Sequence, residues 1–408
     1  MWILEQFSSA LNKAKHGLAP ALYALERNMG LPIIRGTWFF VDPKSGSNLN
    51  GGRSIADAVA DIEAAYNLCT TNVGDGIVIL SSDATTTANT TSYLSHPLVW
   101  AKNSITVIGI SAPTKFAQRA RISNVTHTTG TDVTTIAFPT TTTITDSASG
   151  FLTAGFEVGD VLRITGTGSG TNDGTGHIIT AVTTGTITCA GSTFSVVNAA
   201  TTGSCTISSY CTDLISVTGS NNSFMNLHLS HLGADALELT ALKVSGSRNY
   251  FANIHAGVGV ADANTTITHS LWLAAAAENT FESCTFGLDT VDRGGVATYD
   301  IYLSGAVARN EFHGCRTTRH SSTGTGCLAI YADTTTGGRP TLFVNCIFSI
   351  WNTAGGNANC SYMFGSTGAC DFVWFVDCTY PGYAALSNDS VAWISGEVNT
   401  QASGLMYT

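Results

Sequence analysis

The sequence predicts an all-β solenoid, a parallel β-helix, from three observations: a short pattern that repeats, alternating apolar residues before each copy, and a low content of charge. The pattern is a phenylalanine, any residue, a small polar residue and a residue of the kind that proteins bury. Six copies lie within residues 214–381, and successive phenylalanines are 27 to 32 residues apart. Self-similarity at a period of about 20 to 50 residues is typical of repeat architectures.

The repeat predicts two buried ladders of identical side chains. In a solenoid each coil packs only against the coils before and after it, so a given position keeps its residue type. The predicted ladders are Phe224, Phe251, Phe281, Phe312, Phe343 and Phe375, and Cys284, Cys315, Cys346 and Cys378. Asparagine two residues before four of the phenylalanines (Asn222, Asn249, Asn279 and Asn310) is predicted to occupy a turn, because asparagine tolerates the left-handed conformation.

Alternating apolar residues precede each copy, as in Leu242-Lys-Val244 and Leu271-Trp-Leu273. A period of two indicates strands, and no helical period intervenes, so each unit is predicted to be strand, turn, strand and loop. The alternative is a stacked β-sandwich, which would place a turn about every 8 to 12 residues and would not keep this long register.

Composition narrows the class of protein. The chain has 408 residues, of which 11% are charged, with 42 glycines and a net charge of −10. Few charges suit a β-rich protein that packs against neighbours, and the negative charge argues against a nucleic-acid partner. Without 18 consecutive apolar residues or a basic leader, neither a membrane span nor a signal peptide is expected. Eleven cysteines, an odd number without a Cys-x-x-Cys pair, predict reduced thiols and synthesis in a cytoplasm.

Residues 1–35 are predicted to form a helical arm outside the solenoid. Apolar residues recur at helical spacing, and Gly17 and Pro20 should divide the arm into two helices. Two roles stay open, a cap on the coil stack or an anchor to another protein, since a solenoid end must be covered. As an anchor, its attachment residues would be Trp2, Ile3, Phe7 and Leu11.

Residues 36–137 are predicted to form the N-terminal cap and first coils. A strand ends in Phe40-Val-Asp42, a Gly/Asn-rich turn and a helix from Ile55 to Cys69 follow, and Gly74-Asp-Gly-Ile-Val-Ile-Leu80 is a further strand. This opening resembles right-handed parallel β-helix proteins of the pectate-lyase-like superfamily, in which a short helix caps the first coil. The resemblance implies a right-handed parallel β-helix fold and no particular chemistry.

Residues 138–209 interrupt the coil rhythm. Short strands separated by Gly-Asp and Asn-Asp-Gly turns predict a small antiparallel β-barrel inserted between an early coil and a six-coil stack at 210–381. The segments Gly155-Phe-Glu-Val-Gly-Asp160 and Asn172-Asp-Gly174 resemble a module of structural proteins of tailed bacteriophages. That resemblance implies a virion component and a lateral contact surface. Residues 382–408 are expected to form a short C-terminal tail containing one further strand.

A search for chemistry finds no Ser-His-Asp order, phosphate loop or HExxH motif, and no metal or cofactor is expected. Sugar-cleaving β-helices use two carboxylates, and the candidates here are Asp289, Asp292 and Asp300. Arg293, Glu282 and Asp333 would accompany them on the same face. The competing interpretation is that these are ordinary loop acids. Aromatic residues around Trp272, Tyr302 and Tyr331 fit either a sugar-stacking face or contacts within a trimer.

The resulting expectation is a homotrimeric β-helix on the surface of a tailed bacteriophage particle, either decorating or cementing the capsid or projecting as a spike. Its partners would be further copies of itself and capsid or tail proteins. The first alternative is a tailspike that binds and hydrolyses host surface polysaccharide. The second is a spike that binds polysaccharide without cleaving it.

Overall fold

The computed structural model describes residues 34–80, 91–110, 120–130, 133–168, 171–191, 194–196, 205–231, 237, 239–259, 268–292, 298–322, 327–333, 339–352, 360–367, 372–387 and 393–395. The N-terminal arm lies outside these residues, as do its attachment candidates Trp2, Ile3, Phe7 and Leu11, most of the tail, and Arg293. The described chain forms two compact units. One comprises residues up to Tyr93, Leu98–Ser123 and the chain from Asp213 onward; the other comprises Leu94–Pro97 and Asn124–Thr212.

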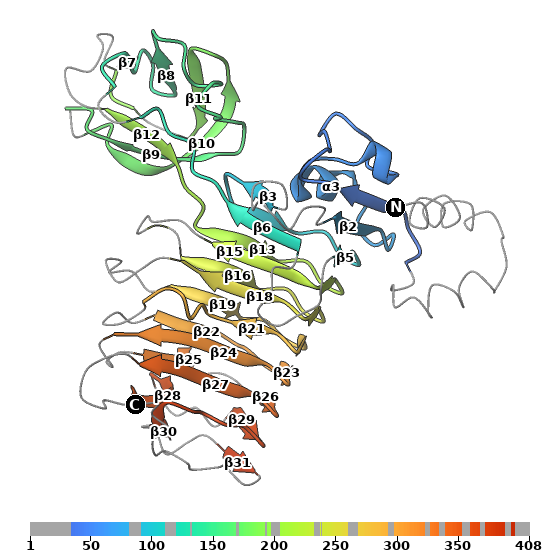
Figure 1. The fold of residues 1–408 in the computed structure, drawn as a ribbon. Helices are drawn as coiled ribbons and strands as arrows, with labels where there is room; N and C mark the ends of the chain where they lie inside the picture. Colours follow the sequence, from blue (N-terminus) through green and yellow to red (C-terminus); the bar gives the residue numbers. More distant parts are fainter. Residues whose placement is uncertain are drawn as a thin grey trace, which may run out of the picture. The chain divides into compact units, whose positions relative to one another are not determined.

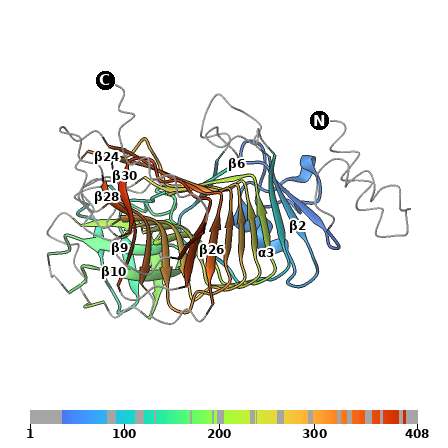
Figure 2. The same cartoon turned by 90° about the horizontal axis from the view of Figure 1, so that it is seen from below.

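The first unit is a right-handed parallel β-helix of about eight turns, built from three parallel sheets (Figures 1 and 2). The phenylalanine-bearing sheet has the order β1 (Trp38–Val41), β2 (Gly76–Leu80), β5 (Thr106–Ile110), β14 (Ser223–Met225), β17 (Tyr250–Ala252), β20 (Thr280–Glu282), β23 (Glu311–His313), β26 (Thr341–Val344), β29 (Val373–Val376) and β31 (Trp393–Ser395). Figure 2 shows its strands stacked side by side around β26.

The other two sheets complete each coil. The sheet before the phenylalanine strand contains β4 (Leu98–Trp100), β13 (Asp213–Val217), β16 (Thr240–Val244), β19 (His269–Ala274), β22 (Thr298–Ser304), β25 (Cys327–Asp333), β28 (Cys360–Ser366) and β30 (Tyr383–Ser387). The sheet after it contains β3 (Thr91–Leu94), β6 (Ala120–Asn124), β15 (Leu227–His231), β18 (His255–Val258), β21 (Thr285–Phe286), β24 (Arg316–Ser321) and β27 (Ile347–Asn352). Each coil therefore has three strands.

The prediction of two strands per coil was wrong because one residue makes the missing corner. Between β17 and β18, Asn253 has a φ of 51°, and the corresponding residue of other coils is also left-handed: Asn226, Ser283, Gly314, Asn345 and Asp377. A single left-handed residue turns the chain sharply without a loop. The small polar residue of the repeat is this corner, and the buried residue after it begins the third side of the coil.

The phenylalanines of the repeat stack through the interior of the β-helix. Neighbouring rings from Phe224 to Phe375 are nearly parallel, with centroids 4.3 to 5.3 Å apart. The cysteine ladder runs beside them, and each thiol donates to a phenylalanine carbonyl of the preceding coil, as Cys315 does to Phe281 at 3.4 Å. The four ladder cysteines are buried and free, as are Cys69, Cys189, Cys205 and Cys211.

The asparagines of the repeat are not the left-handed turn residues; this prediction was wrong. The left-handed φ belongs to the residue before each of them, for example Arg248 at 60°. Asn222, Asn249, Asn279 and Asn310 instead point inward and bond to one another. The Oδ1 atom of Asn279 accepts from the backbone N and the Nδ2 of Asn249, at 2.9 and 3.1 Å. Such a ladder satisfies buried backbone amides at a corner where no strand partner is present.

The predicted helix at 55–69 is divided into two pieces. A 3-10 turn, η1 (Ile55–Asp57), is followed by α3 (Ile62–Leu68), and Asp61 caps α3 by accepting from the backbone N of Ala64 at 2.8 Å. Ala58 is in the extended conformation between them and joins a buried cluster with Trp38, Phe40 and Val78. Ala58 thus packs against these side chains in an extended conformation instead of continuing the helix.

The second unit is a small antiparallel barrel with the strand order β12 (Thr206–Ser209), β9 (Val161–Thr165), β10 (Gly174–Val182), β11 (Thr186–Ala190), β8 (Thr143–Asp146) and β7 (Ile136–Ala137). Bridges Thr128 to Ser208 and Val133 to Cys205 join the chain before β7 to β12. The sheet thereby closes on itself around a separate apolar core that includes Phe138, Phe151 and Ile164. The compact unit begins at Asn124, earlier than the predicted 138.

Strand register in the β-helix runs across the inserted barrel. Strand β4 pairs with β13, β5 with β14 and β6 with β15, although more than 100 residues separate the partners in sequence. At the other end, β30 pairs with β28 and β31 with β29. The coil stack therefore extends beyond residue 381, where the tail was expected to begin.

Candidate functional site

The acids considered for catalysis occupy three different environments. Asp289 is exposed at the surface. Asp292 is half-buried, and its Oδ1 accepts a hydrogen bond from the backbone N of Ser322 at 2.9 Å. Asp300 is only 1% exposed. Asp292 thus fastens its loop to the next coil.

Asp300 belongs to an ion pair inside the β-helix. Its Oδ2 lies 3.6 Å from Nε of Arg319, and both side chains are almost fully buried. The guanidinium also donates from Nη2 to the carbonyl and Oγ1 of Thr298, at 2.6 and 2.9 Å. A charge removed from water requires a partner of this kind. The arrangement connects β22 and β24 through the interior and places Asp300 in the core.

The aromatic residues noted in the sequence form a column on the outer face of the sheet that contains β19, β22 and β25. Trp272, Tyr302 and Tyr331 are register partners in successive coils. Their ring centroids are 5.7 Å apart for Trp272 and Tyr302, and 6.2 Å for Tyr302 and Tyr331. At one end the Nζ of Lys243 lies 3.9 Å above the Trp272 ring and 3.2 Å from Asp213.

The polar atoms of this column are bonded from one coil to the next. Trp272 donates from Nε1 to Oγ of Ser304 at 2.7 Å, and the hydroxyl of Tyr302 donates to Oδ2 of Asp333 at 3.0 Å. Burial, together with that hydrogen bond to a carboxylate, raises the pKa of Tyr302 to about 12. The Tyr302 and Tyr331 rings are stacked and the Trp272 ring is tilted by 42° against Tyr302, so the column presents ring edges, hydroxyls and charged groups to an outside partner.

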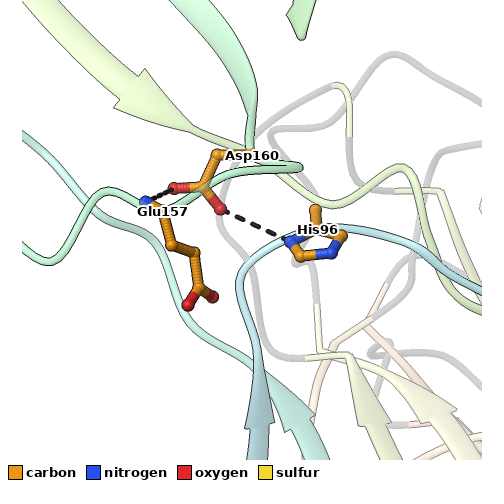
Figure 3. Close-up of side chains that lie close together, drawn as sticks. All are labelled: His96, Glu157 and Asp160. Carbon is orange, nitrogen blue, oxygen red and sulfur yellow. Dashed lines mark hydrogen bonds and ion pairs between the residues drawn. The ribbon is translucent and has the colours of Figure 1, made fainter. Parts of the chain in front are cut away.

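A second cluster lies within the barrel unit, where His96, Glu157 and Asp160 converge (Figure 3). His96 lies between β3 and β4, while Glu157 and Asp160 lie in the turn that precedes β9. One possible ligand atom from each residue lies within 4.8 Å of the other two. Nδ1 of His96 is 3.5 Å from Oδ1 of Asp160.

Asp160 is the centre of this cluster and is fully buried. Its Oδ2 is 3.1 Å from both Nδ1 of His127 and the backbone N of Glu157. Burial alone would raise the pKa of Asp160, but the polar side chains of His127, His96 and Ser95 around it outweigh burial and lower the pKa to about 2. The carboxylate is therefore ionised at neutral pH.

The sequence did not indicate this cluster as a site. Asp160 is the last residue of the Gly-Phe-Glu-Val-Gly-Asp segment, where it looked like ordinary turn chemistry, and His96 is 64 residues away in the chain. The one available signal is the pair of histidines, His96 and His127, that lie outside the repeats. Nothing local in the sequence pairs them with that aspartate.

Comparison with known proteins shows a similarity of fold. No family model and no curated protein matches the sequence. Among solved structures, pectin methylesterase PemA from Erwinia chrysanthemi aligns at 12% identity and a TM-score of 0.41, over 87% of this chain and 81% of its own. ORF18 of Geobacillus virus E2 aligns at 10% identity and a TM-score of 0.39, over 89% of this chain and 56% of its own.

The Gp54 tailspike of Acinetobacter baumannii bacteriophage AP22, in complex with capsular saccharide, aligns at 10% identity and a TM-score of 0.19, over 93% of this chain and 75% of its own. These proteins are right-handed parallel β-helices. At such identities the likeness concerns the fold alone. Among the described residues, no helix is both long and apolar enough to span a membrane.

Proposed function

We propose that the chain is a structural protein on the surface of a tailed bacteriophage particle, assembled as a homotrimer that decorates or cements the capsid or projects as a spike. The observation that carries the proposal is a barrel with its own core, bearing the Gly155–Asp160 and Asn172–Gly174 segments, inserted into a coil stack whose register continues past it. A repetitive coil stack that carries a separately folded module suits a particle protein that must both assemble and attach.

Surface chemistry supports the barrel as an attachment module. Four large aliphatic side chains of this unit are about half exposed: Leu152 at 48%, Val158 at 57%, Ile178 at 47% and Val196 at 52%. Burial of apolar surface against a partner contributes about 25 cal/mol per Å². Contact with another particle protein would cover such side chains, whereas a barrel serving only as a spacer gains nothing from exposing them.

The location on the particle is tested by cryo-electron microscopy of whole particles assembled in cells that make this protein. Density fitting the β-helix at capsid threefold or quasi-threefold positions supports a decoration or cement protein. Density only on the tail supports a spike. Particles that lack the protein altogether would overturn the proposal.

The attachment region is tested by particle incorporation of variants. If the barrel attaches the protein, Val158→Glu with Ile178→Glu should abolish incorporation, while Thr175→Glu at another exposed barrel position should not. If the arm attaches it, deletion of residues 1–35 should have that effect instead. Circular dichroism of the free proteins verifies that each variant is folded. Normal incorporation of both the deletion and the double variant would exclude both regions.

The second candidate function is binding, with or without hydrolysis, of host surface polysaccharide. The column of Trp272, Tyr302 and Tyr331 favours it, since hydroxyls, ring edges and the neighbouring Asp333 can bond to sugar hydroxyls. Substituting both Trp272 and Tyr331 with Ala should weaken binding of purified host polysaccharide at least tenfold. Trp351→Ala, at a 64% exposed tryptophan on another sheet, is the matched control.

Cleavage is tested separately from binding by the release of reducing ends from the same polysaccharide. Loss of release in Asp289→Asn or Asp292→Asn, with binding retained, would establish a polysaccharide depolymerase, either a glycoside hydrolase or a lyase. Wild-type protein that binds without releasing sugars would be a binding spike.

A further inference from the structure

The cluster around Asp160 has the composition and geometry of a metal site. It joins an imidazole nitrogen and two carboxylates, from two segments that are distant in sequence and lie in one compact unit. Zinc binds this mixture of nitrogen and oxygen ligands, whereas calcium and magnesium prefer oxygen alone. In a tetrahedral zinc site, neighbouring ligand atoms lie roughly 3.3 to 3.5 Å apart. The 3.5 Å between His96 Nδ1 and Asp160 Oδ1 already matches that spacing.

The two carboxylate oxygens of Asp160 differ in their hydrogen bonds. Oδ2 is held by His127 and by the backbone N of Glu157. Oδ1 is buried and makes no hydrogen bond, and it is the oxygen that lies toward His96. Leaving a buried carboxylate oxygen without a hydrogen bond is costly. A metal-binding carboxylate is itself held by hydrogen bonds from outer partners, as Oδ2 of Asp160 is held here.

The other two side chains are positioned by their neighbours. The hydroxyl of Ser95 lies 3.2 Å from Nδ1 of His96 and donates to Oε1 of Glu157 at 2.5 Å. Gly159, with a φ of 104°, leaves room for the His96 ring, because a Cβ there would lie 2.9 Å from Nε2. The imidazole and the Glu157 carboxylate are therefore kept within reach of Asp160 before any ligand binds.

We propose that His96 Nδ1, Glu157 and Asp160 bind one divalent transition-metal ion of the zinc class, with His127 orienting Asp160 and solvent completing the coordination. The ion would tie the segment Leu94–Pro97, which leads into β4, to the turn before β9. Since metal binding to the folded form stabilises it by mass action, the ion would act as a staple of this unit. The sequence predicts no metal, because no pattern in it pairs His96 with Asp160.

The test uses the full chain without an affinity tag, stripped of metal with EDTA. Titration with Zn²⁺ in a calorimeter should give one site, and Co²⁺ should give the visible absorption of a four-coordinate centre. Zn²⁺ should also raise the melting temperature. Glu157→Gln removes an exposed ligand but keeps the backbone N that donates to Asp160, so the variant should still fold. It should bind Zn²⁺ at least about tenfold more weakly than the wild type.

Glu311→Gln is the matched control, because Glu311 forms another exposed pair with His313, whose Nε2 is 2.9 Å from its Oε2. That variant should bind Zn²⁺ like the wild type. His96→Gln gives a second ligand variant and should also weaken binding. Binding of Zn²⁺ that is absent below about 100 μM, or equal in the wild type and Glu157→Gln, would overturn the proposal.

Discussion

At the scale of single residues, the buried asparagines supply hydrogen bonds at a corner of each coil where backbone amides have no strand partner. Asn279 accepts from Asn249 and its own Nδ2 donates to Oδ1 of Asn310 at 3.0 Å. Each asparagine thus satisfies amides of the coils on both sides. The glutamate and arginine residues just before them carry the strained left-handed φ at the exposed surface.

Removal of one asparagine should therefore destabilise more than one coil. Asn279→Ala leaves at least two buried donors without acceptors, and each such group costs about 1 to 3 kcal/mol. The expected loss in the free energy of unfolding is about 2 to 4 kcal/mol, measured by denaturant titration. Asn67→Ala, at an exposed position of α3, is the control and should change stability by less than about 0.5 kcal/mol. Equal effects of the two substitutions would show that the ladder contributes nothing.

A second prediction at this scale concerns Asp146 of the barrel. Burial would raise its pKa, but hydrogen bonds from Thr135 and from the backbone N of Ala148 and Gly150 outweigh it, so the pKa lies below the usual 3.8. Because the folded pKa is depressed, this contribution to stability is complete above the unfolded value and is lost as pH falls through the folded one.

Asp146→Asn should thus lower the stability of the barrel at pH 7 by about 1 to 2 kcal/mol, since the amide accepts weaker hydrogen bonds. The difference from the wild type should shrink as pH decreases below about 4. Chemical denaturation at pH 7 and at pH 3 measures it. A difference that stays constant between these pH values would contradict the assigned hydrogen bonds.

At the scale of elements, the phenylalanine ladder and the inserted barrel lead to two different predictions about stability. The ladder is cooperative, because each ring is packed between rings of both neighbouring coils. Phe312→Ala should cost about 3 to 5 kcal/mol from the lost transfer energy and the remaining cavity. Phe312→Leu, which preserves much of the volume, should cost less, and thermal unfolding distinguishes the two. Equal melting temperatures for both variants would argue against tight packing at this position.

The barrel has its own core, and the coil strands on either side of it pair directly with one another. Replacing residues 125–212 with a short Gly-Ser linker should therefore leave a folded β-helix with a cooperative thermal transition. Far-ultraviolet circular dichroism and differential scanning calorimetry are the measurements. An unfolded or aggregated product would mean that the coils need the barrel to form.

At the scale of the whole molecule, the proposed trimer predicts an assembly of three times the 42.5 kDa chain. Light scattering on a size-exclusion column measures this mass directly. A chain of which only 11% of the residues are charged suits packing against copies of itself. A mass of one chain at micromolar concentration would confine trimer formation to the particle, and a dimer would exclude threefold assembly.

The sequence alone determined the repeating part of this protein. In a solenoid the neighbours of Phe281 are the same residue one coil away, so a linear period reports a three-dimensional contact directly. The phenylalanine and cysteine columns and the parallel strands could be predicted on this basis, and the inserted antiparallel unit from its Gly-Asp and Asn-Asp-Gly turns. The third strand of each coil could not, because the only mark of its corner is one left-handed residue such as Asn253.

Only the tertiary structure decided where the non-repeating polar groups meet. His96 reaches Asp160 across 64 residues, and Asp300 pairs with Arg319 inside the β-helix rather than with another acid on its surface. Neither contact recurs from coil to coil, so no repeat in the sequence predicts it. Their physical cause is the need of each buried charge for a partner, which chain folding satisfies from whatever segment lies closest in space.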